Sequence, residues 1–146
     1  MTGGEVDFDT RVWSVPAARM KAGVPHRVPL SDRVIEILEK QREKAKHTDL
    51  VFPSPRGQVL TDMALTKFLR DHKAKSDTRG RVATAHGFRS SFRDWASESG
   101  YPRDLAERAL AHTIKDQSEA AYHRTDLLEQ RREMMEAWAA TVRGGN

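Results

Sequence analysis

A histidine and an arginine stand three residues apart in the segment His86-Gly87-Phe88-Arg89. Residues at this spacing lie on one face of a helix, so both side chains can reach the same anion. The guanidinium group is a forked, permanently charged donor that suits phosphate oxygens. The spacing is weak evidence by itself, because it arises by chance in many proteins. The competing interpretation is a histidine at a helix N-terminus followed by a solvated arginine.

A second set of candidate groups lies farther along the chain. Leu110-Ala111-His112 ends an expected helix, and Tyr122 follows ten residues after His112 in a polar segment. A phenol is a weak nucleophile near neutral pH unless neighbouring cations and a base assist it. The groups that could assist it here are His86, Arg89, His112 and Lys21. The alternative is that the Tyr122 ring only covers the core.

The sequence argues against several other kinds of site. It has no cysteine, which excludes disulfide bonds, thiol catalysis and cysteine-based zinc sites. The six histidines lack the paired spacing of a metal site, and no H-E-x-x-H motif occurs. There is neither a glycine-rich nucleotide loop nor a G-x-S-x-G elbow. We therefore expect no metal and no cofactor.

The positive charge is concentrated in one stretch. The whole sequence carries a net charge of +4, whereas the window from Lys67 to Arg93 holds eight basic and two acidic residues and carries +6. The remaining 17 basic and 19 acidic residues sum to −2. A positive electrostatic field that is focused on one face is typical of nucleic-acid-binding proteins. The alternative is a solvated helix and loop of the same composition that has no partner. The candidate nucleic-acid-binding residues are Lys67, Arg70, Lys73, Lys75, Arg79, Arg81 and Arg93.

The order of these motifs resembles the catalytic domain of the tyrosine recombinases, the phage integrase family. Lys21 on an expected hairpin, the H-x-x-R segment, His112 and Tyr122 follow one another as the family's catalytic motifs do. Longer segments are similar to prophage and genomic-island integrases in particular. They are Trp13-Ser14-Val15-Pro16-Ala17-Ala18-Arg19-Met20-Lys21, His26-Arg27-Val28-Pro29-Leu30-Ser31, Val51-Phe52-Pro53-Ser54, Ala85-His86-Gly87-Phe88-Arg89 and Tyr122-His123-Arg124-Thr125. The similarity covers essentially the whole chain, and several spaced motifs in one order are far more specific than any single motif.

The resemblance implies a metal-free transesterification on double-stranded DNA, the chemistry of site-specific recombination and of prophage integration. Tyr122 would attack a DNA phosphate, forming a 3′-phosphotyrosine and releasing a 5′-hydroxyl. Arg89 and His112 would hold the non-bridging oxygens, Lys21 would protonate the departing 5′-oxygen, and His86 would help proton transfer at the nucleophile. The family also implies a homo-oligomer, a tetramer on DNA in the full-length protein. The resemblance also implies a cytoplasmic, DNA-associated protein, encoded by a bacterium or a phage, that has no membrane partner.

The sequence departs from the family pattern at one catalytic position. The family has a further arginine on a helix that precedes the strand corresponding here to Val6–Val15, and neither Arg11 nor Arg19 matches that motif. We therefore expect residues 1–146 to be the C-terminal part of the catalytic domain, unable to recombine DNA efficiently by itself. The alternative is a non-catalytic DNA-binding remnant of an integrase. A third interpretation, a basic RNA-binding or ribosome-associated module, leaves the ordered motifs unexplained.

Length and composition bound the fold that must position these groups. With 146 residues, of which 38% are apolar and 32% charged, the chain suits one domain with a thin core. No apolar run approaches the roughly 20 residues that span a bilayer, and the start does not resemble a secretion signal. We predict a mainly α protein of the α+β kind. A small N-terminal antiparallel hairpin occupies 1–30, and a region like a helical bundle occupies 31–146.

Local patterns predict the individual elements. Strands are expected at Val12–Val15 and His26–Leu30, with Lys21 near the hairpin tip and Pro16 at an edge or a strand end. Helices are expected to begin after the N-cap residues Ser31, Thr61 and Thr84, at Pro102, and at Thr125.

The same patterns predict which segments stay outside the core. The Lys73–Arg81 segment has too few apolar residues to pack, so we expect an exposed loop there. A short helix is predicted to hold Tyr122 between the last two long helices. The apolar stripe of the final helix is predicted to consist of Leu127, Leu128, Met134, Met135, Trp138 and Val142.

Overall fold

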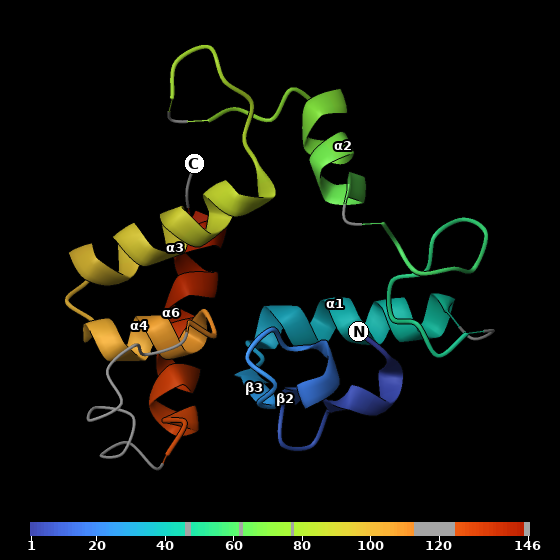
Figure 1. The fold of residues 1–146 in the computed structure, drawn as a ribbon, viewed down its shortest axis with the longest axis horizontal. Helices are drawn as coiled ribbons and strands as arrows, with labels where there is room; N and C mark the ends of the chain where they lie inside the picture. Colours follow the sequence, from blue (N-terminus) through green and yellow to red (C-terminus); the bar gives the residue numbers. More distant parts are fainter. Residues whose placement is uncertain (46–47, 62, 77, 113–124, 145–146) are drawn as a thin grey trace.

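The computed structural model describes residues 1–45, 48–61, 63–76, 78–112 and 125–144. Within these ranges the chain forms one three-stranded antiparallel sheet and five α-helices (Figure 1), which confirms the predicted fold class. The short helix predicted around Tyr122 falls outside the described residues. No helix in the described ranges is long and apolar enough to cross a membrane. The elements are β1 (Val6–Asp7), β2 (Val12–Val15), β3 (His26–Pro29), α1 (Asp32–Lys44), α2 (Met63–Asp71), α3 (Ala85–Glu98), α4 (Arg103–Ala109) and α6 (Leu128–Gly144).

The predicted hairpin forms the main part of the sheet. The strand order is β1-β2-β3, and β2 pairs with β3 so that Val15 lies opposite His26. Pro16, which has no N–H to donate, follows the end of β2 and so does not interrupt the central strand. The connection between the two strands carries Lys21, which is exposed. Lys21 therefore lies on the hairpin connection, as predicted.

Helix α1 covers the sheet and completes the first of two small cores. Leu38, with 2% of its surface exposed, packs with the buried residues Val6, Leu30 and Val51. Burying an aliphatic side chain of this size contributes about 1.5–3 kcal/mol. Four such residues make a thin core, which agrees with the modest apolar content of the sequence.

The start of α1 is capped differently from the prediction. Ser31 occupies the N-cap position, but its side chain makes no capping hydrogen bond. Instead the amide N–H of Asp32 donates to the carboxylate of Glu136 on α6 at 2.8 Å. The first amides of a helix lack partners within the helix, and an anion there also interacts favourably with the helix dipole. The cap thus comes from a residue 104 positions away and ties α1 to α6.

The second core lies where α3, α4 and α6 meet. Phe92, Leu105 and Met134 are its buried members, one from each helix. The rings of Phe92 and Trp138 pack edge to face with centroids 5.5 Å apart, a geometry that aromatic quadrupoles favour. Figure 1 shows α6 passing behind α3 and α4.

The ends of α3 follow the sequence signals. Thr84 is its N-cap, and the hydroxyl oxygen accepts a hydrogen bond from the N–H of Gly87 at 3.0 Å. Gly100 adopts a φ of +78° just after the helix, a conformation that glycine reaches without steric cost. These two residues fix the helix that carries His86 and Arg89.

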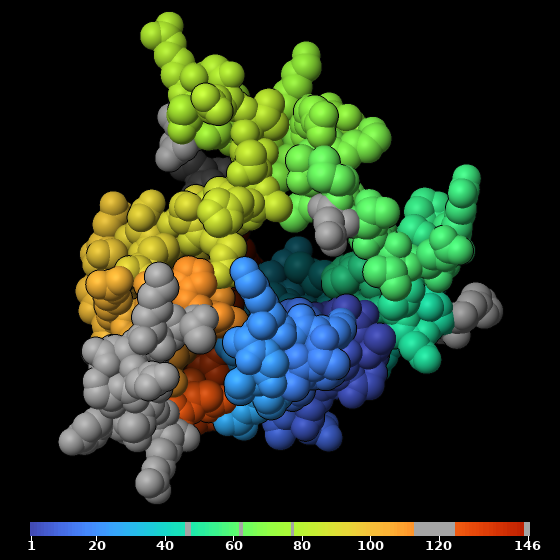
Figure 2. All heavy atoms as spheres, in the orientation of Figure 1, coloured from blue at the N-terminus to red at the C-terminus, as the bar shows by residue number. Residues whose placement is uncertain are grey.

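Helix α2 and the loop that follows it project from the rest of the molecule at the upper edge of Figure 2. Leu69 is buried, whereas Met63 and Phe68 keep 58% and 55% of their surface exposed. The basic loop is closed by a bridge between Lys75 and Val82. Its basic residues are exposed, as predicted for the Lys73–Arg81 segment.

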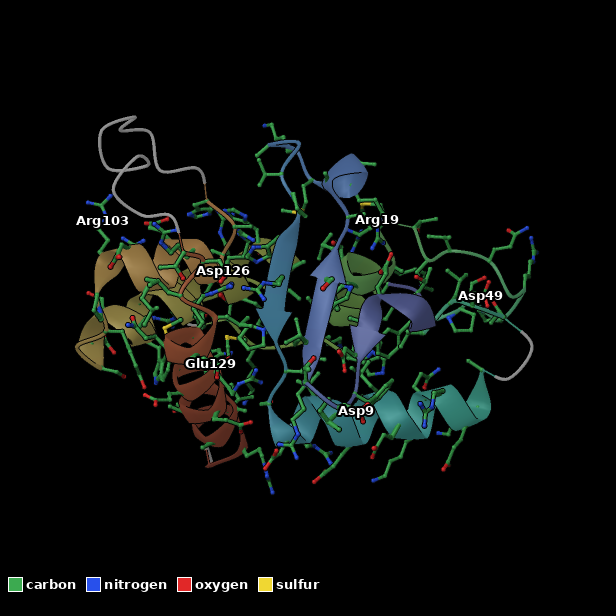
Figure 3. All side chains as sticks on the ribbon, turned by 90° about the horizontal axis from the view of Figure 1, so that it is seen from below. Asp9, Arg19, Asp49, Arg103, Asp126 and Glu129 are labelled. Atoms are coloured by element: carbon green, nitrogen blue, oxygen red, sulfur yellow. The ribbon has the colours of Figure 1, made fainter. Side chains whose placement is uncertain are left out.

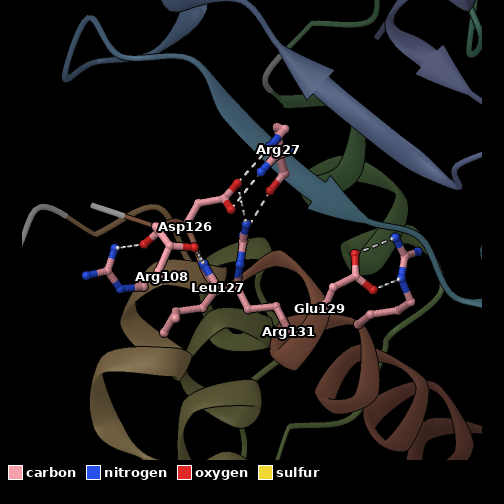
Figure 4. A network of polar contacts seen from close by, with 8 residues as sticks. Arg27, Arg108, Asp126, Leu127, Glu129 and Arg131 are labelled. Atoms are coloured by element: carbon pink, nitrogen blue, oxygen red, sulfur yellow. Dashed lines mark hydrogen bonds and ion pairs between the residues drawn. The ribbon is translucent and has the colours of Figure 1, made fainter. Parts of the chain in front are cut away.

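A buried arginine joins the two cores. Arg131 on α6 is 1% exposed, and its Nη1 donates to the carbonyl oxygen of Arg27 on β3 at 2.8 Å. Its Nη2 lies 3.3 Å from the carboxylate of Asp126, which also accepts two hydrogen bonds of 2.8 Å from the Arg27 side chain. Figure 3 shows Asp126 beside β3, and Figure 4 shows the whole network. Partial burial opposes the shift, but these arginines hold the pKa of Asp126 below its usual value.

The last helix differs from the prediction in three respects. It begins at Leu128 instead of Thr125, and Arg131 occupies the face that the prediction filled with apolar residues alone. Arg131 stands three residues before Met134, which places both on the buried face. Val142, predicted in the apolar stripe, is 61% exposed, because it lies beyond the part of α6 that packs in the second core.

The variant Asp126→Asn should lower the free energy of unfolding by about 2–3 kcal/mol, because it leaves the Arg131 charge buried without an anion. The cost is below the 3–5 kcal/mol of a fully buried pair, since the Asp126 side chain keeps 36% of its surface exposed. Urea denaturation measures the difference. Glu129→Gln is the control, because Glu129 pairs with Arg132 while 78% exposed, and it should change the stability by less than about 1 kcal/mol. Equal losses in the two variants would contradict a structural role for the Arg131 charge.

Candidate functional site

Arg89 connects α3 to the end of α4. It lies in the second turn of α3, and its Nη2 donates to the carbonyl oxygen of Leu110 at 2.8 Å. Leu110 is the C-cap residue of α4, so this carbonyl has no partner within the helix. The Arg89 side chain stays exposed, and its guanidinium group keeps donors for a further partner.

His112 is held against the same helix end. Ala111 adopts a φ of +53°, an uncommon conformation for a residue other than glycine, and the chain turns back there. The amide N–H of His112 then donates to the carbonyl oxygen of Glu107 at 2.9 Å, and its ring Nδ1 contacts the Glu107 carboxylate. Partial burial and the positive charges of Arg89 and Arg93 lower the pKa of His112.

The structure thus brings two of the candidate catalytic residues together, Arg89 and His112, at the junction of α3 and α4. His86 lies one turn before Arg89 on α3 and is exposed. In the described part of the chain, no hydrogen bond or ion pair joins either His86 or Lys21 to the other candidates. Tyr122 lies outside the described residues, so its convergence with the others stays a prediction.

The candidate nucleic-acid-binding residues fall into two groups. Lys67 pairs with Asp71 on α2, and Arg93 pairs with Glu107 on α4, so these two cations already have anionic partners. The others are exposed and form no ion pair within the described residues. They are Arg70, Lys73, Lys75, Arg79 and Arg81. The free positive charge therefore lies on the end of α2 and the projecting loop, above the start of α3 (Figure 2).

Glu107 is a residue that the sequence interpretation missed. Its carboxylate contacts His112 on one oxygen and Arg93 on the other, and Arg103 lies 3.8 Å away. Its side chain is only 19% exposed. The sequence did contain a signal that could have identified Glu107. It is an acidic residue about one helical turn before His112, in a part of the chain rich in arginine.

His26 was also missed. It is half-buried on β3, where its ring hydrogen-bonds the backbone of Ala109 at the end of α4. Burial, together with the charge of Arg131, lowers the pKa of His26. The end of α4 is thus contacted by Arg89 from one element and by His26 from another. No local sequence pattern predicts this contact, because it joins residues far apart in the sequence.

Comparisons with known proteins agree with these motifs. A family model described as "Phage integrase family" matches residues 1–127. The chain is 37% identical over 142 residues to the prophage integrase IntA of Escherichia coli strain K12, which covers 97% of this chain and 34% of that protein. It is 34% identical over 139 residues to the prophage integrase IntZ of the same strain, covering 94% of this chain and 33% of that protein.

A phage protein gives a similar result. The integrase of Enterobacteria phage P4 is 32% identical over 151 residues, covering 92% of this chain and 34% of that protein. The chain therefore spans about a third of the length of the curated relatives it matches. No solved structure matches it.

The free energy of unfolding should fall as the pH is lowered from about 7 to about 5. The lowered pKa of His26 and of His112 means that the unfolded chain takes up protons first, near the ordinary histidine value of about 6.5. The contribution of these two histidines to the free energy of unfolding is complete above that value. It is lost as the pH falls toward the pKa that each histidine has in the folded state. Carboxyl groups titrate mainly below this range.

The variant His26→Gln should make this pH dependence shallower, since it removes a titrating group and retains a donor for Ala109. Chemical denaturation at several pH values measures the slope. His72→Gln, at an exposed histidine after α2, is the control and should leave the slope unchanged. A slope that His26→Gln does not alter would contradict the assignment.

Proposed function

The chain belongs to the phage integrase family, and on this premise we propose that it is part of a site-specific DNA recombinase that cleaves and rejoins strands through a 3′-phosphotyrosine. Double-stranded DNA is then its partner, and the bacterial cytoplasm is where it acts. The complete protein would work as a tetramer on DNA. The residues that carry the reaction are Tyr122, Arg89, His112, Lys21 and His86.

The meeting of Arg89 and His112 at the α3–α4 junction is the observation that carries this proposal. The Arg89 guanidinium donates a hydrogen bond to the carbonyl oxygen of Leu110, which stands two residues before His112. Its positive charge also acts on the His112 ring. A phosphate at this junction would gain a permanently charged forked donor and an imidazole donor. Donors fixed before the reaction stabilise developing charge without the cost of reorganisation.

The proposed reaction needs no external energy source. The phenol oxygen of Tyr122 attacks the phosphorus, and the bond from phosphorus to the 5′-oxygen breaks. His86 helps to remove the phenol proton, and Lys21 gives a proton to the departing 5′-oxygen. Arg89 and His112 stabilise the negative charge on the non-bridging oxygens. The energy of the broken ester stays in the phosphotyrosine bond, so the 5′-hydroxyl of a second strand can reseal it.

DNA binding by the chain should weaken steeply as the salt concentration rises. The exposed cations on α2 and the loop contact phosphates, and each contact releases a condensed counterion. The double variant Arg79→Ala/Arg81→Ala should reduce the slope of log affinity against log salt by up to about 2. Titration of a labelled duplex at several salt concentrations measures this.

A charge-matched control separates local contacts from net charge. The double variant Arg56→Ala/Arg143→Ala removes two exposed arginines outside the basic window and should leave the slope nearly unchanged. An affinity of the parent chain that does not respond to salt would contradict a surface dominated by phosphate contacts.

The 146-residue chain should form only traces of a covalent adduct with nicked DNA. The family's first arginine has no match in this sequence, and losing one preorganised donor typically costs about 100- to 1000-fold in rate. A pool of nicked duplexes with random sequence at the nick avoids any need to know the attachment site. The short 5′-hydroxyl strand diffuses away after cleavage, so the phosphotyrosine accumulates and is seen as a protein–DNA band in a denaturing gel.

Tyr122→Phe should remove this adduct completely. Tyr101→Phe is a matched control, because the chain has two tyrosines and Tyr101 packs its ring in the second core. An adduct that survives Tyr122→Phe would contradict the assigned nucleophile. Salt-dependent DNA binding with no adduct at all would favour the non-catalytic DNA-binding remnant.

A further inference from the structure

One carboxylate organises the polar groups at the α3–α4 junction. Glu107 lies on α4 with its side chain 19% exposed, and its two oxygens contact different elements. One oxygen pairs with Arg93 on α3, and the other contacts Nδ1 of His112. The backbone carbonyl of Glu107 also accepts the amide N–H of His112 at 2.9 Å. Both the backbone and the ring of His112 are therefore fixed by the same residue.

This contact decides which ring nitrogen of His112 is available. An ionised carboxylate can only accept hydrogen bonds, so Nδ1 must carry the proton that it donates to Glu107. The second nitrogen, Nε2, is then left for another partner, and the side chain is 47% exposed. In the neutral ring Nε2 has a lone pair and cannot donate to a phosphate oxygen. Only the doubly protonated ring donates at both nitrogens.

The charges around His112 make Glu107 the group that favours this doubly protonated form. The positive charges of Arg89 and Arg93 on α3 act on the ring, and Arg103 lies near Glu107 on α4. Partial burial and the two α3 arginines lower the pKa of His112, so the ring loses its second proton readily. A hydrogen-bonded anion acts in the opposite direction. Without Glu107 the ring would face these arginines with no compensating charge.

We propose that Glu107 is a positioning residue of the phosphate site: it fixes the Nδ1 proton of His112, directs Nε2 to the phosphate and supports the charged ring as a donor. This inference rests on the proposed function, because the phosphate is the one to be attacked by Tyr122. Glu107 itself touches no reacting atom. Through Arg93 it also holds α3 against α4, and hence keeps Arg89 beside His112.

The first test measures the His112 ring directly in the 146-residue chain, without DNA. Nitrogen NMR should show the neutral ring protonated on Nδ1. The variant Glu107→Gln should lower the pKa of His112 further and weaken this preference, because it removes the hydrogen-bonded anion. The control Glu98→Gln, an exposed residue near the end of α3 with the same loss of charge, should change neither. A parent ring protonated on Nε2, or the same pKa in Glu107→Gln, would overturn the proposal.

The second test follows adduct formation with the nicked duplexes at several pH values. Above the pKa of His112, Glu107→Gln should form the Tyr122 adduct several-fold more slowly than the parent, because a lower pKa leaves a smaller fraction of the His112 ring charged. Well below that pKa the two rates should converge. A merely structural role would lower the rate by the same factor at every pH, and that result would overturn the proposal.

The two tests separate this inference from the proposed function. If the parent forms no Tyr122-dependent adduct at any pH, the recombinase proposal fails. The NMR measurement on the parent, which needs neither DNA nor a variant, still decides whether Glu107 sets the proton position on His112. A chain that forms the adduct but carries its His112 proton on Nε2 would reject the role of Glu107 alone.

Discussion

The fold depends on burying one positive charge. Moving an arginine side chain out of water costs several kcal/mol unless an anion and hydrogen bonds compensate it. Arg131 is compensated by the carboxylate of Asp126 and by the carbonyl of Arg27, which belong to different parts of the chain. Helix α6, strand β3 and the segment before α6 must therefore meet at one point. The two small apolar cores lie on either side of it, and each alone is thin.

The candidate site is a consequence of this arrangement. Helix α4 is packed against α6 through Leu105 and Met134, and its end is contacted by His26 from the sheet and by Arg89 from α3. The end of α4 is thus fixed from several sides, and His112 follows directly after it. A site that must hold a phosphate needs donors placed before the reaction, and fixing a helix end accomplishes this.

The sequence predicted the local features well because they depend on neighbouring residues. The Thr84 cap, the stop at Gly100 and the Val12–Val15 strand each follow from side-chain chemistry within a few positions. The junction of Arg89 and His112 was predicted only through the motif order, not from any local pattern. The catalytic roles themselves stay predictions.

The sequence did not predict features that need two distant elements. The cap of α1 comes from Glu136 instead of Ser31, because the Asp32 amide meets α6 only in the folded chain. The predicted buried stripe of the last helix did not include Arg131, because nothing near it in the sequence reveals that Asp126 and Arg27 converge on its side chain. Glu107 stands close to His112 in sequence, but its significance comes from Arg93 on another helix.

The central claim is that Arg89 and His112 form one anion site at the α3–α4 junction. Titration of the 146-residue chain with inorganic phosphate, followed by the NMR signals of the Arg89 guanidinium and the His112 ring, tests it most directly. The account predicts that both signals move along one binding curve, while the signal of exposed Arg143 stays still. If phosphate shifts only the NMR signals of the basic loop at 73–81, and the signals of Arg89 and His112 do not change, the claim is contradicted.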